Sequence, residues 1–335
     1  MSDGADTITD ALRRMDLLSG GQSVTAEPLS GGVSCDVWRV TLPTGPIVVK
    51  RALPKLRVAA DWRAPAERTG AEVDWFRLVG GLDPRIVPEV LGEDRAHHIF
   101  AMEYLPPDTH PLWKTELAAG RVDAEFAGRV GDTLARIHAS TANHDDVAHD
   151  FAHQVQFHAL RLEPYLLFSA KKNPDVAARI RALSDGIAKS RITLMQGDIS
   201  PKNILCGPDG PVFLDAETAC YGDPAFDLAF CLNHLLLKCV WHPEFTDAYL
   251  KSFDALVDAY LDGVTWEAPE DVEARTAALL PALLLARVDG KSPVEYLTDE
   301  KDCAFVRDTA KSLLKSPADT LGELRDDYLA ATSSR

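Results

Sequence analysis

The chain has 335 residues, a hydrophobic content of 46% and a formal net charge of −16. This length exceeds the usual size of one compact core, so two lobes or domains are expected. The acidic balance argues against a nucleic-acid-binding protein, which needs a basic surface to pair with phosphates.

The expected location is cytoplasmic, with no membrane partner. The first 18 residues are polar and acidic at their start, unlike a signal peptide. The longest apolar runs, such as PALLLARV, fall far short of the roughly 20 residues that span a bilayer. None of the six cysteines has C-x-x-C spacing, so buried free thiols are predicted instead of disulfides.

The first 105 residues are predicted to form a small α+β lobe. Apolar residues at helical spacing alternate here with β-branched stretches that are separated by Gly and Pro turn signals. The predicted helices cover 6–18 and 66–81, and the predicted strands cover 23–29, 36–42, 46–53, 85–94 and 97–105.

From Pro106 onward helical patterns dominate, and residues 106–335 are predicted to form a larger, mainly helical lobe. One β-rich island, 192–217, interrupts these helices. The expected fold class is therefore α+β, with a small β-rich N-terminal lobe and a large helical C-terminal lobe. The predicted helices of the second lobe cover 124–140, 151–168, 176–189, 225–238, 270–288 and 305–315.

The β-rich island carries three oxygen-bearing side chains. The turn signal at 207–210 separates two short β-rich runs and predicts a hairpin. This hairpin folds Asn203, at its start, back towards Asp215, at its end, with Asp198 close by. Phosphoryl transfer needs such a set, because one carboxylate orients the attacking hydroxyl while an amide and a second carboxylate hold Mg²⁺.

The motifs QGDISPKNIL and FLDAETACYGDPAFDLA resemble those of the aminoglycoside phosphotransferase, choline kinase and methylthioribose kinase group, within the protein-kinase-like superfamily. The resemblance spans roughly residues 28 to 235 and covers two ordered motifs at matching spacing. It implies that Asp198 is the catalytic base. It also implies that Asn203 and Asp215 are Mg²⁺ ligands and that Glu217 is an auxiliary metal or substrate group.

The resemblance further implies residues that support the catalytic loop. Asp227 would brace the loop through hydrogen bonds to its backbone, whereas Asp223 is equally well explained as the start of a helix. The family's usual His before Gly-Asp is Gln196 here, which leaves loop positioning and pH behaviour open. The predicted supporting residues are Gln196, Lys202 and Asp227.

The first lobe resembles the nucleotide side of these kinases. LSGGVSCDVWRV is similar to their glycine-rich loop, although a Gly-Gly turn alone also fits an ordinary hairpin. Lys50 matches the phosphate-gripping lysine, and Glu72 its ion-pair partner, with Glu67 as the alternative. FAMEYL resembles the hinge that binds the purine. The predicted nucleotide-binding residues are Gly31, Gly32, Ser34, Lys50, Glu72, Met102, Glu103, Tyr104 and Leu105.

The helical lobe supplies the candidates for binding the acceptor. Polar and aromatic residues four apart form a stripe along 157–165. The apolar helix 270–288 runs into a group of charges at a Gly-Ser-Pro turn, which fits either a pocket rim or an ordinary helix end with cations at its negative pole. The candidate residues are Arg161, Tyr165, Arg287, Asp289 and Lys291.

The sequence therefore predicts an ATP- and Mg²⁺-dependent phosphotransferase, with GTP left open as donor, that acts on a hydroxyl of a small molecule. The alternative is a pseudokinase that binds nucleotide without turnover, which only Gln196 favours. A protein kinase is disfavoured, because the chain lacks a D-F-G to A-P-E activation segment. The identity and charge of the acceptor and the oligomeric state stay open.

Overall fold

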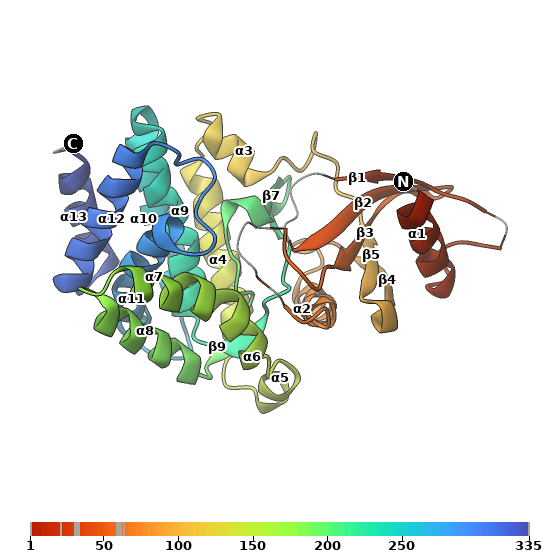
Figure 1. The fold of residues 1–335 in the computed structure, drawn as a ribbon, viewed down its shortest axis with the longest axis horizontal. Helices are drawn as coiled ribbons and strands as arrows, with labels where there is room; N and C mark the ends of the chain where they lie inside the picture. The colour runs from red at the N-terminus through yellow and green to blue at the C-terminus, as the bar shows by residue number, and fades with distance from the viewer. Residues whose placement is uncertain (1, 21, 30–33, 58–61, 63, 334–335) are drawn as a thin grey trace.

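The structure is a computed structural model that describes residues 2–20, 22–29, 34–57, 62 and 64–333. Gly31 and Gly32 lie outside the described residues. Across the described stretches, no helix combines the length and the apolar character that a membrane crossing requires. The chain forms a β-rich lobe and a larger helical lobe, as Figure 1 shows, so the predicted α+β bilobal fold is confirmed.

The N-terminal lobe is an antiparallel sheet with the strand order β1-β2-β3-β5-β4. Its strands are β1 (Thr25–Pro28), β2 (Cys35–Leu42), β3 (Gly45–Ala52), β4 (Val90–Asp94) and β5 (Ile99–Glu103), and its helices are α1 (Ser2–Arg14) and α2 (Arg68–Leu82). Side chains alternate along β3. Ile47 and Val49 belong to the cluster that α1 covers, whereas Val48 belongs to the cluster that includes α2. Lys50 therefore faces α2.

The C-terminal lobe contains two small antiparallel sheets among its helices. One pairs β6 (Thr193–Met195) with β9 (Cys220–Gly222), and the other pairs β7 (Ile204–Gly207) with β8 (Gly210–Phe213). The α-helices are α3 (Trp113–Ala118), α4 (Ala124–Thr141), α5 (Asp145–Asp150), α6 (Gln154–Phe157), α7 (Phe168–Lys172), α8 (Ala177–Lys189), α9 (Ala225–Trp241), α10 (Thr246–Asp262), α11 (Pro269–Asp289), α12 (Glu300–Lys315) and α13 (Leu321–Ser333).

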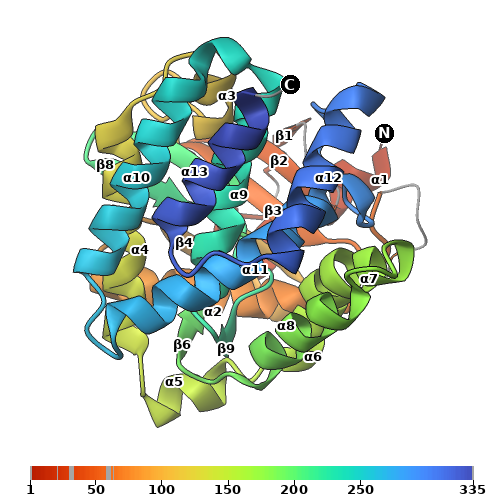
Figure 2. The same ribbon diagram turned by 90° about the vertical axis from the view of Figure 1, so that its left-hand side faces the viewer.

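Helix α9 forms the centre of this lobe, and Figure 2 shows it enclosed by α10, α11, α12 and α13. Every side chain from Ala225 to Val240 is buried. Helices α4 and α10 approach closely because Gly131 has no side chain, since a Cβ there would collide with the carbonyl oxygen of Leu256. All six cysteines are free thiols, as predicted.

Several elements differ from the predictions. Helix α1 ends at Arg14, short of residue 18, because Asp16 takes a left-handed conformation with φ 59°. Leu18 is then buried against the sheet outside the helix. Residues Asp145–Asp150 form the short helix α5, which was not among the predicted helices. Helices α10 and α13 and strand β9 were not predicted.

Candidate active site

The β7–β8 hairpin brings Asn203 and Asp215 together. Its register pairs Ile204 with Phe213, and the next backbone bond runs from the Leu214 N–H to the Asn203 carbonyl at 2.8 Å. Asp215 leaves the strand in a left-handed conformation with φ 61°. The convergence of the two residues at one end of the hairpin is the arrangement that the turn signal predicts.

The carboxylate of Asp198 is buried at this end of the hairpin. Its Oδ2 accepts a hydrogen bond from Asn203 Nδ2 at 2.8 Å, and it lies 3.0 Å from Arg161 Nη2 and 2.9 Å from Lys202 Nζ. Its Oδ1 is also buried but has no hydrogen-bond partner among the described residues. One oxygen is thus held by three donors, and the other is left to accept a hydrogen bond from a hydroxyl group.

Helix α9 fixes the loop that carries Asp198. Asp227, fully buried on α9, accepts hydrogen bonds from the backbone N–H groups of Gln196 at 2.7 Å and Gly197 at 2.8 Å. Gly197 has φ 80°, and a Cβ there would lie 2.7 Å from the Thr218 carbonyl oxygen. Only glycine fits this turn. The backbone of the loop is therefore held at two consecutive residues.

Lys50 connects the two lobes at the site. Its Nζ lies 2.8 Å from Glu72 Oε1 on α2 and 2.5 Å from Asp215 Oδ1. Burial alone would lower the pKa of Lys50, but Asp215 and Glu72 outweigh it and raise the pKa well above its usual value. Burial opposes ionisation of Asp215 as well, yet the charge of Lys50 lowers the pKa of Asp215 to about 2. Glu67, the alternative partner, is the residue just before α2.

Glu217 is bound to the N-terminal lobe. Its Oε2 accepts a hydrogen bond from Arg68 Nε at 2.8 Å and one from the Cys35 thiol at 3.4 Å. The Arg68 guanidinium is fully buried and also donates to the carbonyl oxygens of Ser34 at 2.6 Å and Leu53 at 2.8 Å. Arg68 therefore ties Ser34 and Leu53, which flank β2 and β3, to Glu217.

The remaining predicted nucleotide residues line the end of the sheet. Ser34 is buried, and its carbonyl is one of the acceptors of Arg68. Met102 is buried at the end of β5, and the Glu103 N–H donates to the Glu89 carbonyl at 2.9 Å. Tyr104 and Leu105 are partly exposed where β5 leads into the second lobe. Residues 102–105 thus run continuously from the end of β5 into the connection between the lobes, and Ser34 lies apart from them, just before β2.

The donor set fits a magnesium ion. Asn203 uses its amide N–H groups for Asp198, which leaves its Oδ1, and Asp215 uses Oδ1 for Lys50, which leaves Oδ2. Mg²⁺ takes one or two protein oxygens and fills its other positions with phosphate oxygens and water. Among the described residues there is no group of three or more His, Cys, Asp or Glu side chains that could hold a metal ion.

Arg161 and Tyr165 lie on a π-helical segment, His158–Leu167, that contains Pro164. The Arg161 guanidinium is buried, and its Nε donates to the Gly197 carbonyl at 2.6 Å in addition to the contact with Asp198. Arg161 thus lies at the Asp198 carboxylate itself and is not exposed to a separate pocket. Tyr165 packs against Phe230 of α9 with 5.5 Å between the ring centroids.

The three charged residues at the end of α11 are spread over different contacts. Arg287 Nη1 donates to the Tyr165 hydroxyl at 3.1 Å and to the Ser292 carbonyl at 2.6 Å. Asp289 accepts from Arg307 and Asn173, and Lys291 pairs with Glu163 at 2.6 Å. Of the three, Arg287 lies in contact with Tyr165, whereas the charges of Asp289 and Lys291 are already paired within the helical lobe.

Comparison with known proteins agrees with this geometry. The sequence matches the phosphotransferase enzyme family (APH) over residues 25–268. The chain belongs to this family. It is 25% identical to methylthioribose kinase 1 of Oryza sativa subsp. japonica over 243 residues, which is 64% of this chain and 56% of that protein. The chain thus spans little more than half the length of these curated relatives, with 57% for methylthioribose kinase 2 of the same rice.

The phosphotransferase fold is also shared with solved structures of low sequence identity. A choline/ethanolamine kinase family protein from Mesorhizobium loti is similar with a TM-score of 0.53 and 16% identity, over 98% of this chain and 99% of that one. The amicoumacin kinase hAmiN, in complex with AMP-PNP, Ca²⁺ and Ami, is similar with a TM-score of 0.55 and 14% identity, over 88% and 90% of the two chains. At these identities the likeness concerns the fold.

Gln196 takes the position of the family's usual histidine and connects both halves of the site. Its Nε2 donates to the carbonyl oxygens of Leu214 at 2.7 Å and Asp215 at 3.0 Å, and its Oε1 accepts from the Asp198 N–H at 2.6 Å. A neutral histidine has one donor and one acceptor on its ring, so it cannot make all three bonds. Glutamine therefore holds Asp198 and Asp215 together without a titratable group.

A Gln196→His variant should acquire an acid limb in the pH profile of ADP release. Gln196 does not titrate, whereas histidine gains a proton near its usual pKa of about 6.5 and then can no longer accept the Asp198 N–H. We expect the initial rate of the variant to fall below about pH 6.5 relative to the wild type. The rate should be measured from pH 5.5 to 8.5 in both proteins. Profiles of the same shape would show that position 196 does not control the loop.

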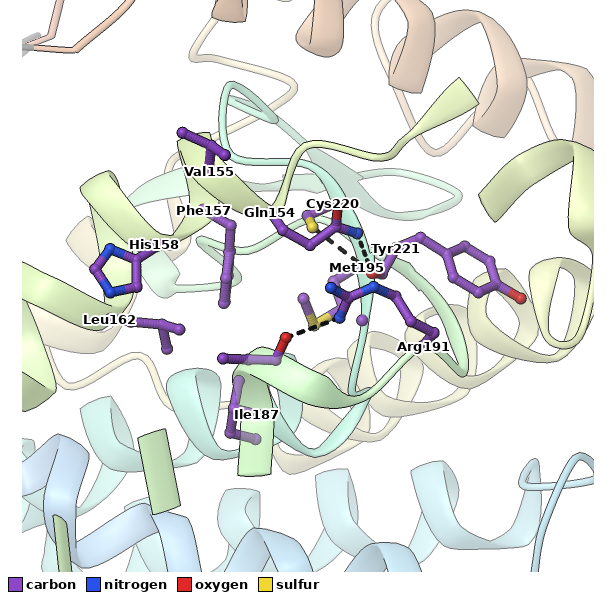
Figure 3. Close-up of a pocket in the computed structure, with 12 residues that line it drawn as sticks. Gln154, Val155, Phe157, His158, Leu162, Ile187, Arg191, Met195, Cys220 and Tyr221 are labelled. Carbon is purple, nitrogen blue, oxygen red and sulfur yellow. Dashed lines mark hydrogen bonds between the residues drawn. The ribbon is translucent and has the colours of Figure 1, made fainter. Parts of the chain in front are cut away.

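A separate cavity of about 370 Å³ lies behind the loop that carries Asp198 (Figure 3). Met195 and the β9 residues Cys220 and Tyr221 form one wall, and side chains of α6, the π-helical segment and α8 form the others. The lining is mostly apolar, and Asp198 is not part of it. The cavity is therefore not the site at which a hydroxyl meets the catalytic carboxylate.

Proposed function

We propose that this chain is an ATP- and Mg²⁺-dependent kinase that transfers the γ-phosphoryl group to a hydroxyl of a small molecule. The observation that carries the proposal is the buried Asp198 carboxylate, with Oδ2 held by three donors and Oδ1 unpartnered among the described residues. This carboxylate stands beside Asn203 and beside the chain of charges formed by Asp215, Lys50 and Glu72. That is the arrangement that phosphoryl transfer needs.

In the proposed reaction, Asp198 Oδ1 accepts the hydrogen bond of the acceptor hydroxyl and takes its proton as the oxygen attacks. Lys50, whose raised pKa keeps it charged, neutralises phosphate oxygens from the side of β3. Asn203 Oδ1 and Asp215 Oδ2 would hold Mg²⁺, which supplies charge neutralisation and orientation of the phosphates when it is bound. The nucleotide would bind to the lobe of residues 1–105 and the acceptor to that of residues 106–335, in the cytoplasm.

In this proposal, Glu217 supplies an auxiliary oxygen for the metal ion. Its Oε2 is engaged by Arg68 and Cys35, so Oε1 is the oxygen that remains for a metal ion or its water shell. Arg68 then sets the position of Glu217 from the N-terminal lobe. A displacement of Ser34, whose carbonyl Arg68 also binds, would be transmitted to Glu217.

The alternative is a pseudokinase that binds nucleotide without turnover. Gln196 is the feature that favours it, but Gln196 makes the hydrogen bonds that position Asp198 and Asp215. The deciding experiment is a coupled assay of ADP release with Mg·ATP, and in parallel with Mg·GTP, over a panel of hydroxylated metabolites and antibiotics. Release of product above the Asp198→Asn background supports the kinase, and nucleotide binding with no release above it supports the pseudokinase.

A further inference from the structure

Three buried basic side chains, His234, Lys238 and Arg287, lie on α9 and α11. Their exposed fractions are 6%, 1% and 5%. Each has a buried nitrogen without a hydrogen-bond partner in the described part of the chain, namely His234 Nε2, Lys238 Nζ and Arg287 Nε. Buried polar groups in proteins nearly always have a partner, so three unpaired nitrogens in one place need an explanation.

A series of ring contacts links these side chains to Asp198. Arg161, which contacts Asp198, and Arg287 both lie against the Tyr165 ring, with Cζ atoms 5.7 and 5.5 Å from its centroid. The Arg161 Cζ is also 5.7 Å from the Phe230 ring, and His234 lies one helical turn further along α9, with 5.9 Å between the centroids. Lys238 follows by another turn.

Lys238 and Arg287 leave an excess of positive charge in this region. Burial lowers the pKa of His234 well below its usual value, so His234 contributes an uncharged ring nitrogen. Among the described residues, no carboxylate forms an ion pair with His234, Lys238 or Arg287. The nearby Lys114 is paired with Glu295. Burial, followed by the charge of Lys114, lowers the pKa of Lys238 to about 8. Unpaired buried charges cost free energy, and a protein commonly keeps such groups where a ligand compensates them.

Aromatic rings cover Lys238 and compensate only part of this cost. Its Nζ lies 4.9 Å from the Trp241 ring and 4.8 Å from the Tyr296 ring. Tyr296 is partly exposed and belongs to the segment between α11 and α12, and its hydroxyl is 3.4 Å from His234 Nδ1. Because Tyr296 is not part of a helix, its ring is the part of this cover that can be displaced most easily by a ligand.

We propose that His234, Lys238 and Arg287 bind an anionic group of the acceptor, a carboxylate or a phosphate, while its hydroxyl meets Asp198. This inference rests on the proposed kinase function and names the substrate class of the same site. The cluster would repel a cationic acceptor, although the net charge of the whole chain, −16, would attract one. The local charge decides, because surface charges far from the site are screened.

The first test measures anion binding without turnover. The melting temperature is recorded with sodium acetate, sodium phosphate or sodium chloride at equal ionic strength and saturating Mg·ADP. Acetate or phosphate should raise the melting temperature of the wild type by several degrees over chloride, and which of the two does so identifies the group. Lys238→Met should lose this shift. Lys172→Met is the matched control, because Lys172 also lies over an aromatic ring, 4.9 Å from Phe168, but is exposed.

The Lys238→Met protein should fold, because methionine fills similar space and removes an unpaired buried charge. Its melting temperature in chloride should equal or exceed that of the wild type. An anion shift that is equal in wild type and Lys238→Met, or absent in both, would overturn the proposal. Failure of the protein to bind ADP would count against the kinase function, and the comparison between the two variants would still decide on the anion site.

The second test compares acceptors that share one carbon skeleton: sorbitol, gluconate and sorbitol 6-phosphate. In ADP release, one of the anionic acceptors should be used with a higher kcat/KM than sorbitol. Lys238→Met should raise KM for that acceptor by about 30-fold with little change in kcat or in KM for ATP. A preference for sorbitol that Lys238→Met leaves unchanged would refute the anion site while the kinase function stands. If none of the three is phosphorylated, the melting experiment decides.

Discussion

Replacing Asp198 by Asn should lower kcat by about three orders of magnitude, a loss of the size that removal of a general base causes. The amide keeps the shape of the side chain but cannot take the proton of the acceptor hydroxyl. Nucleotide binding should persist, because Lys50, Glu72 and Asp215 do not depend on Asp198 for their mutual contacts. The measurement is single-turnover ADP formation together with calorimetric binding of Mg·ADP.

Asp209→Asn is the matched control for this experiment. Asp209 is exposed in the turn of the same β7–β8 hairpin, so its substitution makes the same chemical change without touching the site. Asp209→Asn should keep the activity of the wild type. Retention of more than about one tenth of kcat by Asp198→Asn would fall outside the range for a general base and remove Asp198 from that role.

The proximity of Asn203 and Asp215 could be predicted from the sequence because it depends on short-range geometry. A two-stranded hairpin with a strong turn signal has one register that places its ends together, and the structure has this register. The lobe order, the strands of the first sheet and the long helices followed from periodicity for a similar reason. These features are encoded within windows of about ten to twenty residues.

The contacts of Arg68 and Arg161 could not be read from the sequence. Arg68 meets Glu217, which is 149 residues away, and Arg161 meets Asp198 across a different part of the fold. The stripe of 157–165 was visible, but periodicity shows only that a face is shared and not which neighbour it meets. The prediction that Arg161 binds the acceptor stays a prediction, and the structure adds that its guanidinium contacts Asp198 and the Gly197 carbonyl.

The π-helical segment His158–Leu167 and strand β9 show a second limit of prediction. Pro164 interrupts the regular hydrogen bonds of a helix, and the chain responds with a wider turn that an ordinary helical pattern does not indicate. Strand β9 has only three residues and is defined by its pairing with β6, not by its own composition. Both elements support the catalytic loop, so the least predictable local structure lies next to the proposed chemistry.

The cluster of His234, Lys238 and Arg287 illustrates the same point for the substrate. In the sequence, His234 and Lys238 are two polar residues within a long apolar helix, and only the structure shows that their nitrogens are buried without partners. A net charge of −16 says nothing about this local excess of positive charge. Substrate class therefore depends on which charges the fold leaves unpaired, which is a property of tertiary contacts.

Asp215→Asn should reduce kcat at least about 100-fold, since it removes a carboxylate that would hold the metal ion. It should also abolish the gain in ADP affinity that Mg²⁺ confers, which calorimetry with and without Mg²⁺ measures. Lys50 keeps Glu72 as partner in this variant, so the fold should survive.

In the wild type, the contact between Asp215 and Lys50 depends on pH. Because the pKa of Asp215 is lowered to about 2 from an ordinary 3.8, this stabilising contact is complete above pH 3.8 and is lost as the pH falls towards 2.

Glu217→Gln is the informative companion of Asp215→Asn. The Glu217 carboxylate already shares Oε2 with Arg68 and Cys35, and glutamine can keep a hydrogen bond to Arg68 through its carbonyl oxygen. Its effect on the Mg²⁺-dependent gain in ADP affinity should therefore be several-fold smaller than that of Asp215→Asn. Equal losses in the two variants would make Glu217 a full metal ligand, and an intact Mg²⁺ effect in Asp215→Asn would move the metal away from Asp215.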